Sequence, residues 1–254
     1  MTRIDLNADV GESFGTYSIG YDAGLMRSIT SANVAAGFHA GDPSVVRETI
    51  RLAKASGVAV GAHPGFPDLI GFGRRELRVT PREAEDFVLY QIAAVAGVAG
   101  AEGVRLQHVK PHGALYSMAA RDAELAGAIA RAIVAFDPSL TLVGPPSSEL
   151  LAAGRAAGVP LAAEGFADRA YEPDASLVSR QKPGSLIDDP RAVVTRGVRM
   201  ARDGTVVAID GSVVRLHVAT ICLHGDTPDS DHLARELRAG LEAAGIAVEA
   251  LGRG

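Results

Sequence analysis

The sequence contains few aromatic residues, three lysines and one cysteine. Tryptophan is absent, and aromatic residues make up 5% of the chain. The single cysteine, Cys222, cannot form an intrachain disulfide, and the N-terminus has no basic segment followed by an apolar one, so we expect a cytoplasmic protein. Glycine, arginine or aspartate interrupts every apolar run well before the roughly 18 residues of a membrane span, so no membrane segment is expected.

Clusters of basic residues are also missing. The formal net charge is -5 and lysine and arginine never form a run, which argues against nucleic acid or an anionic membrane surface as a partner. Neither G-x-x-x-x-G-K-[ST] nor a G-x-G-x-x-G after the first expected strand occurs, so the common phosphate-binding loops are absent. The expected partners are therefore small molecules or proteins.

Short apolar runs recur along the chain, and each is followed by a turn and a segment of helical period. This pattern predicts an α/β fold built from repeated β-α units around a parallel sheet. With 254 residues, 47% of them hydrophobic, we expect one domain over residues 1–254. The seven expected strands are RIDLNA from Arg3, SANVAAG from Ser31, VAVGAH from Val58, VRLQHVK from Val104, SLTLVG from Ser139, PLAAEG from Pro160 and VATICLHG from Val218.

Helix starts are marked by a capping residue followed by proline. This pair occurs at Asp42-Pro43, Thr80-Pro81, Asp189-Pro190 and Thr227-Pro228. Two segments interrupt the β-α rhythm. Residues 204–216 (GTVVAIDGSVVRL) predict a β-hairpin that turns at Asp-Gly, and residues 166–187 are long, polar and without helical period, as in binding loops or lids.

Polar residues gather where the expected strands end. The carboxyl ends of parallel strands converge in α/β folds, so these side chains should lie close together and form a site. Glycine and proline beside them allow tight turns and would leave backbone N–H groups open toward a ligand. The residues are Asn7, Asp9, Glu12, His39, Asp42, His63, Lys110, His112, Arg180, Lys182, His224 and Asp226.

Some of these residues also have plain structural interpretations. Asp42 caps the helix that begins at Pro43, and His108 and His217 lie inside strand runs as structural groups, whereas His232 is expected on a solvated helix face. Imidazoles and carboxylates suit a divalent metal, but no H-E-x-x-H motif is present. The sequence leaves the presence of a metal undecided.

Six long motifs resemble those of one known family, LamB/YcsF. In chain order they are LNADVGE from Leu6, NVAAGFHAGD from Asn33, GAHPGFPDLIGFGRR from Gly61, VKPHGALY from Val109, SRQKPGSLI from Ser179 and CLHGD from Cys222. The resemblance implies a seven-stranded parallel β/α barrel similar to glycoside hydrolase and deacetylase barrels, with the hairpin as an insertion. It also implies a role as the A subunit of a bacterial ATP-dependent 5-oxoprolinase, which works with subunits B and C on 5-oxoproline, with ATP as co-substrate.

The resemblance suggests roles for the polar residues. Asp9 with His39 or His63 would deprotonate a water molecule, and Lys110 with His112 would stabilise charge on the lactam oxygen or its phosphate, so Lys110→Ala should lose turnover without unfolding. Two alternatives stay open: a metal-dependent amide or lactam hydrolase that needs no ATP, and a non-catalytic subunit that binds a lactam or sugar. Substrate-binding roles are expected for Asn7, Glu12, Arg180, Lys182, His224 and Asp226.

Overall fold

The computed structural model describes residues 2–223 and 229–252, and in this part of the chain seven parallel strands close into a barrel. The strand order is β10-β1-β2-β3-β4-β5-β6-β9, and β1 also pairs with β9, which closes the ring. All seven strands expected from the sequence are present. The barrel strands are β1 Arg3–Val10, β2 Ser31–Ala35, β3 Ala59–His63, β4 Leu106–Val109, β5 Thr141–Gly144, β6 Leu161–Phe166 and β9 Thr220–Leu223.

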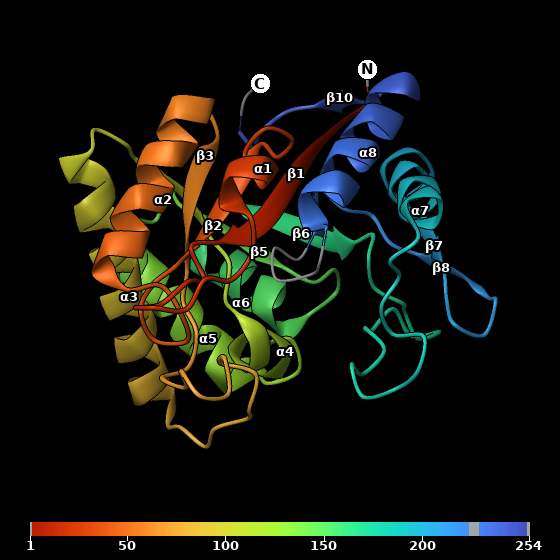
Figure 1. Cartoon of the computed structure of the whole chain (residues 1–254). Helices are drawn as coiled ribbons and strands as arrows, with labels where there is room; N and C mark the ends of the chain where they lie inside the picture. Colours follow the sequence, from red (N-terminus) through yellow and green to blue (C-terminus); the bar gives the residue numbers. More distant parts are fainter. Residues whose placement is uncertain (1, 224–228, 253–254) are drawn as a thin grey trace.

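Helices surround the barrel on its outer side (Figure 1). Asp42 accepts hydrogen bonds from the N–H groups of the first turn of α2, and Thr80 and Glu83 form a reciprocal capping box at α3. The predicted start at Thr227-Pro228 lies outside the described residues. The helices are α1 Asp22–Leu25, α2 Pro43–Ser56, α3 Pro81–Ala101, α4 Gly113–Ala119, α5 Ala123–Phe136, α6 Glu149–Ala157, α7 Pro190–Asp203 and α8 Ser230–Ala243.

The helix α3 is long and apolar enough, by length and composition alone, to cross a membrane. In the folded chain one side of α3 packs against β3 and α5, with Val88, Ile92, Val95 and Ala99 fully buried. The sequence expectation that no segment would pass such a test is therefore too strict, because the charged residues of this helix all lie within residues 82–86 and the remaining turns carry no charge.

Side chains alternate between the two faces of β1. The apolar side chains Ile4, Leu6, Ala8 and Val10 belong to the core that the helices cover. Asp5, Asn7 and Asp9 have the opposite orientation and contact residues of other barrel strands, so the barrel interior carries a column of polar groups. This interior column ends at Asp9, near the carboxyl end of the strand.

Three further elements complete the fold. The predicted hairpin is present as β7 Thr205–Val207 and β8 Val213–Arg215, paired antiparallel. A short strand missed in the sequence, β10 Ala247–Val248, pairs with the start of β1. The long segment 166–187 contains turns and two isolated bridges, Arg169 with Leu186 and Tyr171 with Leu177.

Candidate functional site

A cavity of about 550 Å³ opens at the carboxyl ends of β1, β3, β4 and β6. Its lining includes five residues of the site expected from the sequence: Asp9, His63, Lys110 and His112 near the strand ends, and Arg180 in the segment 177–181 of the long loop. The four side chains near the strand ends are almost completely buried. The cavity wall thus combines acidic, basic and cationic groups.

Lys110 follows β4 directly and is only 3% exposed. Its ammonium lies 2.9 Å from the Asp9 carboxylate and 3.1 Å from Glu164, and it donates to the sulfur of Cys222. Burial alone would lower the pKa of Lys110, but its negative neighbours raise that pKa well above its usual value. Burial raises the pKa of the Cys222 thiol, so this sulfur is neutral near pH 7 and the two carboxylates provide the stabilising charge.

Glu164 is a site residue that sequence reasoning missed. Its carboxylate, on β6, accepts hydrogen bonds from Asn7 and from the Tyr116 hydroxyl as well as pairing with Lys110. Burial, with the Glu164 charge, raises the pKa of Tyr116 well above its usual value, so the phenol stays a donor. The available signal was an acidic residue near the end of an apolar strand run. Asn7 lies in this buried network and is not among the residues lining the cavity.

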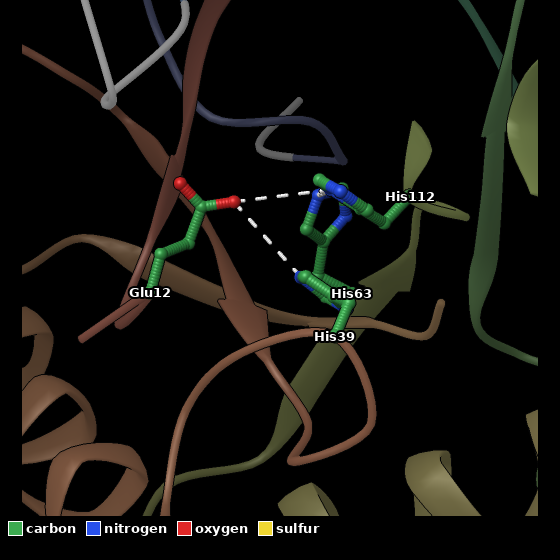
Figure 2. Close-up of side chains that lie close together, drawn as sticks. All are labelled: Glu12, His39, His63 and His112. Carbon is green, nitrogen blue, oxygen red and sulfur yellow. Dashed lines mark hydrogen bonds and ion pairs between the residues drawn. The ribbon is translucent and has the colours of Figure 1, made fainter. Parts of the chain in front are cut away.

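Four buried side chains form a compact cluster beside the cavity (Figure 2). Glu12, His39, His63 and His112 follow or end four consecutive strands, β1 to β4, and each offers one ligand atom within 4.8 Å of the others. In Figure 2 the Glu12 carboxylate faces the rings of His39 and His112, at 3.9 and 3.8 Å. Imidazole and carboxylate are donor types that divalent metals accept, so the set fits a metal ion by composition and spacing.

Two histidines of this cluster, His39 and His112, are held in uncharged forms. Burial lowers the pKa of His39 and of His112 well below the usual value, and the neighbouring imidazoles add to the effect. His63 lies 3.3 Å from the Asp9 carboxylate and 2.9 Å from His112. The cluster therefore offers ring nitrogens with lone pairs at neutral pH.

The loop after β3 makes room for these rings. Phe72 and Gly73 both have positive φ, 54° and 63°, and the Phe72 carbonyl lies 2.8 Å from His112 Nε2. A Cβ on Gly73 would come within 2.8 Å of His39 Cβ. Gly65, in the same loop, donates its N–H to Gln91 and would place a Cβ 2.6 Å from His39 Nδ1. These glycines provide space for imidazoles.

Arginines form the outer part of the cavity wall. Arg180, expected from the sequence, lines it together with Arg74, Arg121 and Arg169, and burial with the nearby Arg180 charge lowers the pKa of Arg169 to about 10. Lys182 is instead exposed and pairs with Glu172, outside the cavity lining. His224 and Asp226, also expected in the site, lie outside the described residues.

The chain matches the model of the LamB/YcsF family over residues 4–253. It is 56% identical to the 5-oxoprolinase A subunit of Methylococcus capsulatus over 98% of this chain and 96% of that protein, and 51% identical to the Bacillus subtilis protein of the same name over 99% and 98%.

Two solved structures share the fold. The lactam utilization protein of Thermus thermophilus superimposes with a TM-score of 0.94 at 48% identity, covering 98% of this chain and all of that one. A family 4 carbohydrate esterase from Streptomyces lividans, at a TM-score of 0.50 and 12% identity over 99% and 93% of the chains, shares the barrel fold alone. Sequence and structure agree that this chain belongs to the LamB/YcsF family.

Proposed function

We propose that this chain is the A subunit of a 5-oxoprolinase. The enzyme opens the lactam ring of 5-oxo-L-proline to give L-glutamate and couples this reaction to hydrolysis of ATP to ADP and phosphate, together with subunits B and C. The observation that carries the proposal is the similarity, over nearly the full length of both chains, to proteins named as 5-oxoprolinase A subunits. The structural likeness to a lactam utilization protein supports the same substrate class.

ATP solves a chemical problem of this substrate. Amide resonance makes the lactam carbonyl a poor electrophile, and transfer of the γ-phosphoryl group to its oxygen gives an imidate phosphate and ADP. Water adds to that carbon, the ring C–N bond breaks so that the nitrogen leaves as the amine, and a second water releases phosphate from the remaining acyl phosphate. The products are glutamate, ADP and phosphate, with two water molecules consumed.

Asp9 is the group we assign to accept the proton of the attacking water. It lines the cavity, and its carboxylate is paired with Lys110 and hydrogen-bonded to Asn33. Positioned general bases contribute about 100-fold to 10,000-fold to rate. His63 lies 3.3 Å from this carboxylate and lines the cavity, whereas His39 is not among the residues lining it.

Cationic groups of the cavity suit the charges of the substrates. Lys110 and His112 line the cavity, and we assign them to stabilise the oxygen charge that develops at the lactam carbonyl, because such electrostatic stabilisation is often the largest catalytic contribution. We assign the substrate carboxylate or the phosphate to Arg180 and Arg169 on the wall of the cavity. The phosphate-binding loop that the sequence lacks would be provided by a partner subunit.

The test measures glutamate and ADP release from 5-oxoproline and ATP, with this chain alone and with its cognate B and C subunits. We expect turnover only in the mixture. Asp9→Asn should lower kcat at least about 100-fold, whereas the control Asp210→Asn, in the exposed turn of the β7–β8 hairpin, should leave it unchanged. Full turnover by Asp9→Asn in an intact complex would refute the assigned base.

The same assay separates the alternatives. Glutamate release by this chain without ATP would indicate an ATP-independent hydrolase. Tight binding of 5-oxoproline, with turnover of the complex unaffected by both Asp9→Asn and His63→Ala, would indicate a binding subunit.

A further inference from the structure

The hydrogen bonds of two cluster histidines fix which ring nitrogen carries the proton. His63 Nδ1 lies 2.7 Å from the carbonyl oxygen of Lys110, and His112 Nε2 lies 2.8 Å from that of Phe72. A carbonyl oxygen can only accept, so each of these nitrogens is the N–H donor. In a neutral imidazole the other nitrogen then bears a lone pair. His63 Nε2 and His112 Nδ1 are therefore both acceptors.

These two lone-pair nitrogens face each other at 2.9 Å. Two acceptors at that separation repel, because neither has a proton to place between them. The arrangement is satisfied only by a positive species that both nitrogens can bind, which is either a shared proton or a metal ion. The surrounding side chains distinguish the two.

His39 points to a metal ion. Its ring is 1% exposed, and neither of its nitrogens has a hydrogen-bond partner in the residues that the structure describes. A shared proton between His63 and His112 would leave these buried polar atoms unsatisfied, which is costly. A metal ion bound by His63, His112 and His39 together would occupy one of the two His39 nitrogens. The Glu12 carboxylate, 3.8–3.9 Å from the His112 and His39 rings, adds a negatively charged ligand.

We propose that Glu12, His39, His63 and His112 bind one divalent transition-metal ion of the Zn²⁺ class (Figure 2). Three imidazoles and a carboxylate suit Zn²⁺ or Co²⁺ better than Mg²⁺ or Ca²⁺, which prefer oxygen ligands. Bonds of about 2.0–2.2 Å put two ligands of one ion at most about 4.4 Å apart. The ligand atoms, now within 4.8 Å, need to contract only slightly.

The carbonyl partners of His63 and His112 are the outer hydrogen bonds that metal-binding histidines usually have, and they orient both rings before the ion arrives. His39 differs from them. It stacks on His112 with an interplanar angle of 3° and centroids 3.8 Å apart, so an ion in the plane of one ring lies off the plane of the other. His39 must therefore tilt on binding, and it has no hydrogen bond to lose among the described residues.

The site lies next to the assigned base, because His63 is 3.3 Å from Asp9. A divalent ion there supplies Lewis-acid polarisation of a substrate oxygen. Metal binding itself does not depend on the proposed 5-oxoprolinase activity, since it is measured on this chain alone and without substrate.

The experiment uses the full chain, stripped with a chelator and dialysed against Zn²⁺ or Co²⁺, followed by elemental analysis. We expect about one ion per chain and visible d–d bands of Co²⁺ typical of nitrogen and oxygen ligands. Zn²⁺ should also raise Tm in a concentration-dependent manner. Less than one tenth of an equivalent of either ion, or an imidazolium signal in the ¹⁵N spectrum of the stripped chain that Zn²⁺ does not alter, would overturn the proposal.

Variants test the ligand set. Loss of an outer hydrogen bond at a metal site lowers metal affinity about 10-fold to 100-fold. His63→Ala and His112→Ala remove a ligand itself, so each should lower Co²⁺ affinity at least about 100-fold. His39→Ala should lose less, because its ring must reorient. The matched control is His232→Ala, on the exposed side of α8, with unchanged affinity. Equal Co²⁺ affinity in all four variants would refute the site, and Glu12→Gln replaces any variant that fails to fold.

Discussion

Replacing Lys110 by methionine should destabilise the barrel strongly. The ammonium is the cation between two buried carboxylates, at 2.9 Å from Asp9 and 3.1 Å from Glu164. Removing one partner of a buried ion pair costs about 3–5 kcal/mol because a charge is left uncompensated. Two carboxylates depend on this lysine, so we expect about 5 kcal/mol, limited by protonation of one of them.

This value is large against the whole stability of a domain, which is about 5–15 kcal/mol. A chain of this size loses about 2–4 °C in Tm per kcal/mol, so Tm should fall by about 10–20 °C. The sequence suggested that loss of this side chain would leave the fold intact. Its burial at 3% exposure revises that expectation, and any loss of turnover in a Lys110 variant must be corrected for unfolded protein.

The assay is urea unfolding followed by circular dichroism near pH 7 for the wild type, Lys110→Met, Glu164→Gln and the double variant. The double variant should be more stable than the sum of the single effects predicts, because Glu164→Gln removes one uncompensated charge. Lys182→Met is the control, since its exposed pair with Glu172 is worth at most about 1 kcal/mol. A change below about 1 kcal/mol in Lys110→Met would refute the reasoning.

Two further predictions concern stability. Burial, with the nearby Lys110 charge, lowers the pKa of His108 to about 3. The unfolded chain binds a proton at this residue below about pH 6.5, whereas the folded chain does so only below about pH 3. The free energy of unfolding should therefore decrease by up to about 1.4 kcal/mol for each unit that the pH falls between about 6.5 and about 3. In His108→Gln this part of the slope should disappear from urea curves measured across the range, and an unchanged slope would contradict the assignment. Gly73→Ala should lower the free energy of unfolding by about 1–2 kcal/mol from its left-handed backbone alone, and by more from the contact of the new methyl with His39. The backbone control is Gly211→Ala, whose added Cβ would lie in open space at φ +87°. A Tm of Gly73→Ala within about 1 °C of the wild type would count against this prediction.

Local sequence patterns predicted the elements well because their causes are local. The Thr80–Glu83 capping box and the cap by Asp42 involve residues within one turn, and both are present. The strands were readable from their apolar runs. The two-residue strand β10 was not, since its pairing with Arg3 and Ile4 depends on the closed barrel and not on its own composition.

The site was predicted in part. The alignment of parallel strand ends was enough to group Asp9, His63, Lys110 and His112, which all line the cavity. The role of Glu164 depends on contacts across the barrel, such as the one with Asn7, 157 residues away, and no local pattern contains that information. Glu12 was expected to bind substrate, whereas the structure groups it with the histidines.

The glycines near the site were interpreted as leaving backbone N–H groups open to a ligand, but the N–H of Gly65 is bonded to Gln91 and that of Gly73 to the Asp68 carbonyl. What the glycines leave open is the place of a Cβ, where an imidazole from another segment packs: His39 against Gly65 and Gly73, and His108 against Gly61. Each of these positions therefore needs glycine because a histidine ring from another segment of the chain packs against it. A side chain at Gly61 or Gly65 therefore requires a smaller side chain at the paired histidine, and at Gly73 the left-handed backbone adds strain of its own.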